Sequence, residues 1–294
     1  MNTPRSHTSE SSTADACGVE FDRGADGIAV ARVGDLVFAL LPSRDGRHLL
    51  ASAWNVSRPL ADLRREDFYS YHGSIDDEAG FRERMIEQAE HRRELKALAR
   101  QTMRMNCNTP WGPSQGATLY AEGVISHSTA GHGGFKLSSE RNAAINPLLR
   151  ADDEFYEEDA AWAIVALTFP DLFTRYERKV AEEIVRDSWP DAWETIFGRS
   201  LAPGQSREKD ARAFARAHAD DWVVISAIRS EHHLDMTEVI ATLGGKRGDG
   251  AKERRFLVPS ADYAAGRFGF VIDETKHAAY SGPSSFVGWR GGSV

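Results

Sequence analysis

Residues 109–138 read TPWGPSQGATLYAEGVISHSTAGHGGFKLS, and this stretch decides how the middle of the chain folds. Its many glycines reach backbone angles that other residues avoid, and they let the backbone approach a ligand closely. The run is too irregular for one helix or one long strand. It predicts turns and short strands that hold His127 and His132 in fixed places.

The polar side chains of this stretch are candidates for chemistry. A histidine in such a loop suits acid or base catalysis because its pKa lies near neutrality. We name His132 as the candidate base, with Thr129 or Ser128 as the candidate nucleophile. A tight turn between two strands, with His132 bonded to the backbone, explains the same pattern without catalysis. The candidate binding residues here are Trp111, Gly112, His127, Gly133 and Gly134.

A second candidate cluster is Tyr156-Glu157-Glu158-Asp159, just before an apolar pattern that begins at Trp162. Acidic side chains in a first helical turn commonly serve the helix dipole. The chain between His132 and this cluster is short enough for a turn to bring one of these carboxylates next to His132. There it would orient the imidazole. We therefore predict Glu158 and Asp159 as catalytic partners and Glu157 as a binding residue.

The absence of several well-known motifs argues against specific chemistries. The phosphate-loop pattern GxxxxGK[ST], the GxGxxG order and the GxSxG nucleophile elbow are all absent. The zinc motif HExxH is absent as well, and Glu231–Asp235, which holds two adjacent histidines, is expected to be a surface cluster. We expect no cofactor and no metal site.

The 294 residues carry a formal net charge of −8, which argues against broad phosphate binding. Acidic side chains are concentrated between residues 150 and 194. The two cysteines, Cys17 and Cys107, are expected to remain reduced in a cytoplasmic protein. No apolar run approaches the length that spans a bilayer, so no membrane association is expected.

The order of patterns predicts an α+β fold, with mixed or antiparallel sheet elements at both ends and a central helical segment. The sequence does not say whether the two ends share one sheet. Five segments are expected: a disordered tail (1–16), a β-hairpin region plus long helix (17–105), the Gly/His motif with an acidic helical domain (106–198), a linker (199–212) and a β-rich region (213–294).

Individual elements follow from apolar periodicity. We expect a hairpin over 28–41, a third strand over 48–56, one helix over 76–105 and a helical region over 152–197 that Pro170 interrupts. The β-rich region is predicted to hold strands at 222–228, 256–259 and 268–272, a short helix at 236–243 and a basic loop at 246–255.

Four motifs, taken in order, resemble an uncharacterised domain family: TPWG, YAEGVISHSTAGHGGFKLS, RNAAINPLLR and FYEEDAAWAIVALTFPDLF. Its members occur in alphaproteobacterial plasmids, in phages and in polyvalent proteins of mobile elements. The resemblance spans about Thr109 to Phe197. It implies a setting in the conflict between mobile elements and host defence, and it implies no activity and no catalytic residue.

Three functions fit these observations. The first is a mobile-element accessory protein that binds a host protein, such as a nucleic-acid-binding enzyme, through an acidic surface and acts against restriction or defence. The second is a hydrolase-like enzyme for nucleic acid or nucleotide, with His132 and a carboxylate from 157–159. The third is a nucleic-acid-associated accessory protein that uses the basic side chains of the helix over 76–105 and the 246–255 loop. The sequence leaves the oligomeric state open.

Overall fold

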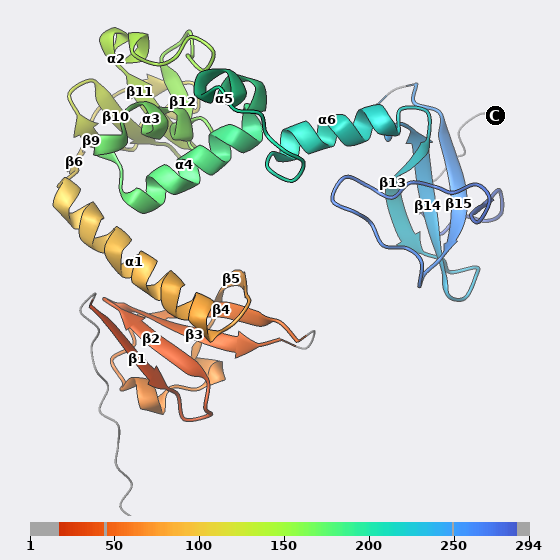
Figure 1. Cartoon of the computed structure of the whole chain (residues 1–294), viewed down its shortest axis with the longest axis horizontal. Coiled ribbons are helices and arrows are strands. Elements are labelled where there is room, and N and C mark those ends of the chain that lie inside the picture. Colours follow the sequence, from red (N-terminus) through yellow and green to blue (C-terminus); the bar gives the residue numbers. More distant parts are fainter. Residues whose placement is uncertain (1–17, 44–45, 249, 287–294) are drawn as a thin grey trace, which may run out of the picture. The chain divides into compact units, whose positions relative to one another are not determined.

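The computed structural model describes residues 18–43, 46–248 and 250–286 (Figure 1). The expected disordered tail, 1–16, lies outside the described residues, as does Cys17. All the sheets are antiparallel. Sheets stand at both ends of the described chain, and the segment between them holds helices and a further sheet, so the predicted α+β class is confirmed. The two end sheets are separate from each other.

The chain forms two compact units, residues 1–183 and 184–294. The first unit opens with a five-stranded sheet in the order β1-β2-β3-β4-β5. The predicted hairpin over 28–41 is confirmed as β2 and β3, which turn at Gly34 with a φ of +63°. The strands are β1 Val19–Arg23, β2 Ala29–Val33, β3 Leu36–Pro42, β4 His48–Trp54 and β5 Ser70–Ile75.

Helix α1, Glu78–Leu98, covers one face of this sheet with Phe81, Met85 and Ala89. The opposite face packs on Leu60, Leu63 and Phe68, around the short 3-10 helices η1 (Leu60–Asp62) and η2 (Arg65–Asp67). The Asp77 side chain caps α1 by accepting from Gly80 N at 2.8 Å. The helix is shorter than the expected 76–105, because Ala99 is left-handed and the next residues pair with another strand.

A second five-stranded sheet occupies the middle of the chain, in the order β12-β11-β10-β9-β6. The Gly-rich stretch supplies three of its strands, as expected, and also a small hairpin formed by β7 and β8. The strands are β6 Gln101–Met103, β7 Asn108–Thr109, β8 Gly112–Pro113, β9 Gly116–Ala121, β10 Val124–Ser128, β11 Gly133–Leu137 and β12 Phe155–Glu157.

The helical region predicted over 152–197 begins later than expected. Residues 152–161 contain strand β12 and turns, and the helical region starts only at Trp162. Pro170 separates α3 from α4, as predicted, and Pro190 begins α5. The elements are α2 Ser139–Ala143, α3 Trp162–Thr168, the 3-10 helix η3 Pro170–Leu172, α4 Arg175–Ser188 and α5 Pro190–Phe197.

The second unit contains a four-stranded sheet in the order β13-β14-β15-β16. The expected linker, 199–212, is irregular only as far as Ser206, whose side chain caps helix α6, Arg207–Ala217. The basic loop joins β14 to β15 and its end enters β15. The strands are β13 Trp222–Arg229, β14 Met236–Leu243, β15 Glu253–Pro259 and β16 Ala278–Ala279.

Two predictions in this unit are wrong. Residues 236–243 form strand β14, and the expected short helix is absent, because β13 and β15 pair with this segment on both sides. Residues 268–272 take part in two isolated bridges, Val223 to Val271 and Gly266 to Gly269, and do not form a strand. Both segments are short apolar runs, whose conformation depends on their partners.

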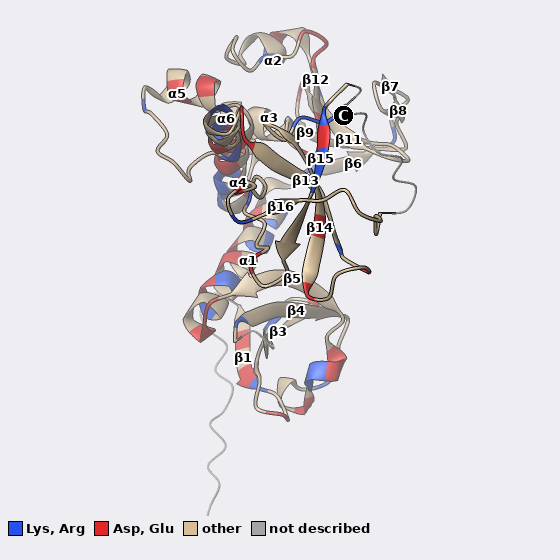
Figure 2. Cartoon of the chain, turned by 90° about the vertical axis from the view of Figure 1, so that its right-hand side faces the viewer, with Lys and Arg blue, Asp and Glu red and all other residues tan. Residues whose placement is uncertain are grey.

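Acidic and basic residues are interspersed along α1 (Figure 2) and along α4. Many pair with each other: Lys179 Nζ lies 3.0 Å from Glu87 Oε1, and an Arg175 nitrogen lies 3.3 Å from Glu90. None of the described helices has both the length and the apolar character that crossing a bilayer requires.

Candidate functional site

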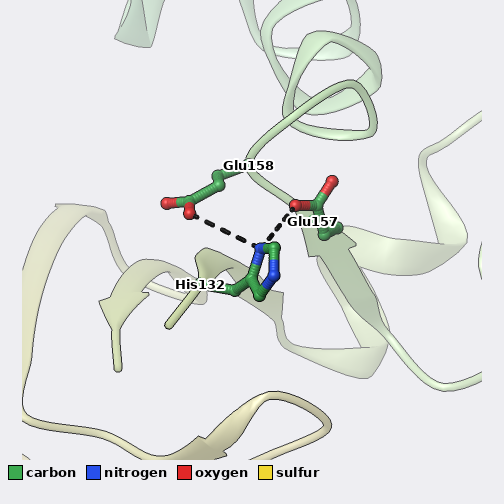
Figure 3. A group of neighbouring side chains, drawn as sticks. All are labelled: His132, Glu157 and Glu158. Atoms are coloured by element: carbon green, nitrogen blue, oxygen red, sulfur yellow. Dashed lines mark ion pairs between the residues drawn. The ribbon is translucent and has the colours of Figure 1, made fainter. Parts of the chain in front are cut away.

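Strand register brings His132 next to the two glutamates that follow it by some 25 residues in sequence. The turn 129–132 joins β10 to β11, and β11 pairs with β12 so that Gly134 faces Glu157. Glu158 N also donates to Gly133 O at 3.0 Å, which continues the pairing beyond β12. His132, Glu157 and Glu158 therefore converge at one end of the central sheet (Figure 3).

The Thr129 side chain holds the turn that presents His132. Its hydroxyl donates to His132 O at 2.7 Å, and its backbone N–H donates to the same oxygen at 2.8 Å. In return, His132 N donates to Thr129 Oγ1 at 3.3 Å. A hydroxyl engaged in this way positions the histidine. The adjacent candidate, Ser128, is directed to Gly116 O at 3.4 Å.

The two residues after His132 must be glycines because neighbouring atoms leave no room for a side chain. A Cβ at Gly133 would lie 2.6 Å from Glu158 Oε2 and 2.7 Å from the His127 carbonyl oxygen. A Cβ at Gly134, whose φ is +157°, would lie 2.4 Å from the Trp111 ring and from Tyr156 O. Any larger residue would push the Glu158 carboxylate or the neighbouring strands away from the site.

Within the site, His132 Nδ1 lies 3.6 Å from Glu157 Oε1 and 4.0 Å from Glu158 Oε1. The side chains of the three residues are 58%, 30% and 49% exposed, in that order, so the imidazole is open to solvent. The Oε1 atom of Glu157 is buried and has no hydrogen-bond partner among the described residues. Its other oxygen accepts from Asp159 N at 2.8 Å, which fixes the carboxylate.

The expectation that the carboxylates come from the first turn of a helix is wrong. Tyr156 and Glu157 lie in β12, and the following residues form turns before α3 begins. The Tyr156 hydroxyl donates to Asn142 Oδ1 at 2.5 Å and accepts from Ala151 N at 3.0 Å. These bonds anchor the strand from its buried side. Asp159 contributes its backbone amide to the site, while its side chain is exposed and outside the group of three.

An aromatic pocket of about 330 Å³ lies against this group. Glu158 belongs to both, since it lines the pocket and faces His132. Ser126 and Glu177 supply the other polar side chains of the lining. The aromatic lining residues are Tyr120, Phe135, Trp162, Phe173 and Tyr176. Most of these residues could not be predicted from the sequence, because they come from separate strands and helices. The one signal for them in the sequence is the number of aromatic residues between 120 and 176.

The candidate binding residues Trp111 and Gly112 belong to the β7–β8 hairpin. The Trp111 ring packs edge-on against Phe155 at 5.8 Å and close to Gly134, so its contacts are structural. Gly112 takes a φ of +118°, which the hairpin turn requires.

His127, another candidate binding residue, is 2% exposed and is not part of the group of three. Ser114 Oγ donates to Gly116 O at 3.1 Å, so it accepts from His127 Nδ1–H at 3.0 Å. Burial lowers the pKa of His127, and the nearby Lys136 charge lowers it further. This histidine therefore serves the core as a neutral ring.

Among the described residues, His132, Glu157 and Glu158 are the one group of three or more His, Cys, Asp or Glu side chains arranged to share an ion. Their ligand atoms all lie within 4.8 Å of one another. The cluster at 231–235 lies in an exposed turn, where His232 N and His233 N donate to Ser230 Oγ. No such group forms there.

No curated protein and no solved structure matches the chain. A family model does match part of it, and the matched part contains every residue of the site described above. The N-terminal sheet, α1 and the C-terminal sheet lie outside that part. Residues 104–219 of the chain are similar to a domain of unknown function, the DUF7007 domain.

Proposed function

We propose that the central domain is a hydrolase that acts on a nucleotide or nucleic acid at His132, Glu157 and Glu158. The observation that carries this proposal is the double position of Glu158, which faces His132 and also lines the aromatic pocket. The residues proposed to activate water and the pocket proposed to hold the substrate therefore have Glu158 in common.

The three side chains suit the activation of water. An imidazole and two carboxylates supply proton acceptors around one point, and His132 is reachable from solvent. In the proposed reaction the water oxygen forms a new bond to phosphorus, and the phosphorus–oxygen bond to the leaving group breaks. The proton of the water passes to the site, and the leaving oxygen takes up a proton.

The pocket suits a planar ring. Bases stack on aromatic side chains without strict sequence preference. A cavity of about 330 Å³ lies at the lower end of the range typical of small-molecule sites. The Ser126 hydroxyl on its wall offers a hydrogen bond to a ring edge. A base held there would place its attached phosphate toward Glu158 and His132.

The two binding hypotheses have less geometric support. Several acidic side chains between residues 150 and 194 are already paired, for example Glu177 with Arg100 and Glu194 with Lys209. Basic side chains of α1 are paired as well, as Arg84 is with Glu87 and Arg92 with Asp35. Both surfaces therefore carry less unpaired charge than the sequence alone indicates.

We also propose that the enzyme works in the cytoplasm, in the mobile-element setting that the four motifs implied. There it would meet host nucleotides and nucleic acids, and an anti-defence role would follow from destroying one of them. A host protein partner then becomes unnecessary for the activity.

The test is turnover of defined substrates by the full chain. Nucleoside mono-, di- and triphosphates, single- and double-stranded DNA and RNA are incubated with the protein, in EDTA and with added Mn²⁺ or Zn²⁺. We expect hydrolysis of at least one class, with His132→Ala lowering kcat by about 10² or more. The exposed histidine variant His232→Ala is the matched control and should keep full activity. Hydrolysis of no substrate, or full turnover by His132→Ala, contradicts the proposal.

A further inference from the structure

We propose that His132, Glu157 and Glu158 bind one divalent transition-metal cation. The inference rests on the proposed function and deepens it, because the cation would be what activates the water. It reverses the expectation from sequence that no metal site is present. The ligand atoms are His132 Nδ1 and one oxygen of each carboxylate.

The spacing of these atoms favours a shared cation over direct hydrogen bonds. His132 Nδ1 and Glu157 Oε1 are 3.6 Å apart, which is too long for a hydrogen bond. Two ligands at about 2.1 Å from a tetrahedral metal ion are separated by about 3.4 Å. The distances of 3.6 Å and 4.0 Å in the site therefore need only small side-chain movements to close on an ion.

An unsatisfied oxygen points to the same conclusion. Glu157 Oε1 is buried without a hydrogen-bond partner among the described residues, and a buried acceptor left in this state costs free energy. Its companion Oε2 is held by Asp159 N at 2.8 Å. One oxygen is thus oriented from outside the site while the other faces His132. This is how outer hydrogen bonds orient the ligands of a metal.

The backbone around the site is built to let the third ligand approach. Gly133 has no space for a Cβ because Glu158 Oε2 would lie 2.6 Å from it. The Thr129 hydroxyl fixes the turn that aims His132. The three ligands thus come from the last residue of β12, from the residue that follows it and from the turn 129–132.

The donor set defines the class of cation. One imidazole and two carboxylates suit Zn²⁺, Mn²⁺ or Fe²⁺, and the absence of thiolate from the group disfavours Cu⁺. Three protein ligands leave coordination positions for water and substrate, as in catalytic sites. Bound Zn²⁺ would lower the pKa of its water to about 7, and the proton would pass to the site as proposed above. The cation would also offset the repulsion between the two carboxylates and a substrate phosphate.

The test is isothermal titration calorimetry of the tag-free, EDTA-stripped full chain with Zn²⁺ and with Mn²⁺. We expect one ion per chain for at least one of the two metals. Glu157→Gln and Glu158→Gln keep the size of each side chain, and each should weaken binding by about tenfold or more. The control is Glu140→Gln, an exposed glutamate of α2, which should bind as the wild type does. Far-ultraviolet circular dichroism confirms that each variant is folded.

The outcomes separate this inference from the proposed function. Absence of binding to the wild type, or equal affinity in wild type and both glutamine variants, overturns the metal site. If hydrolysis persists in EDTA and neither metal binds, the metal site is overturned while the hydrolase stands. If the ion binds at these residues and none of the substrates is hydrolysed, the metal site stands and the hydrolase falls.

Discussion

Arg100 and Glu177 form a two-pronged ion pair, with Nη1 2.9 Å from Oε1 and Nη2 2.6 Å from Oε2. Both side chains are largely buried, at 13% and 18% exposed. The guanidinium also lies 4.0 Å over the Tyr120 ring and donates to Leu172 O at 2.9 Å. Since Tyr120 and Glu177 line the aromatic pocket, this pair fixes one side of the proposed substrate site.

Removal of Arg100 should destabilise the first unit strongly. Arg100→Leu leaves the Glu177 charge in a largely buried place without its partner, and such changes cost about 3–5 kcal/mol of unfolding free energy. The control is Arg93→Leu, since the Arg93 pair with Glu90 is exposed and 3.9 Å long, and its loss should cost less than about 1 kcal/mol. Urea unfolding measures both. Equal losses would show that the pair does not support the pocket.

Gly133→Ala should distort the site. The new Cβ would collide with the His127 carbonyl oxygen and Glu158 Oε2, so the strands or the carboxylate must move. We expect about 1–3 kcal/mol of destabilisation and weaker Zn²⁺ or Mn²⁺ binding. Gly131→Ala is the matched control, because nothing lies within 4 Å of its added Cβ. Calorimetry and urea unfolding test both variants, and unchanged metal affinity in Gly133→Ala would speak against the close fit.

The buried His127 should make stability depend on pH. Its pKa is lowered by burial, so the unfolded chain takes up a proton at higher pH than the folded chain does. The unfolding free energy therefore falls as pH drops below the ordinary histidine pKa of about 6.5, by up to about 1.4 kcal/mol per pH unit between the two pKa values. His127→Asn removes the titration, and its unfolding free energy should fall less between pH 7.5 and 5.5. Parallel pH profiles would contradict this assignment.

Glu238 should be essential to the C-terminal sheet and irrelevant to the site. Burial raises the pKa of this carboxyl, but hydrogen bonds from Ser285 N, Arg255 and Ser284 outweigh it and hold the pKa below its usual range. We expect Glu238→Ala to cost about 3–5 kcal/mol of unfolding free energy and to leave metal affinity unchanged. Glu253→Gln, on the exposed part of β15, is the control. Loss of metal binding in Glu238→Ala would contradict the assignment of the cation to His132, Glu157 and Glu158 alone.

Local patterns predicted much of this fold. The apolar runs on either side of Gly34 identified the hairpin, and the stripe through Phe81, Met85 and Ala89 identified α1. Pro170 marked the end of a helix. These signals depend on neighbours in sequence, which is why they could be recognised without a structure.

The remaining elements depend on pairing between segments far apart in sequence, and this pairing could not be predicted from local patterns. Residues 155–157 form a strand because β11 pairs with them and Tyr156 bonds to Asn142, and neither contact is visible in the acidic sequence around them. Segment 236–243 is a strand for the same reason. His132 and its acidic neighbours could be nominated from sequence, whereas the aromatic pocket required the assembled structure.

That His132, Glu157 and Glu158 act as one site is tested most directly by a double-mutant cycle on turnover. The variants are His132→Ala, Glu157→Gln and the double variant, assayed with the best substrate of the panel. Residues that act as a unit give non-additive losses, so the double variant should be no slower than the slower single variant by more than about threefold. Losses in kcat that simply multiply would contradict a single site.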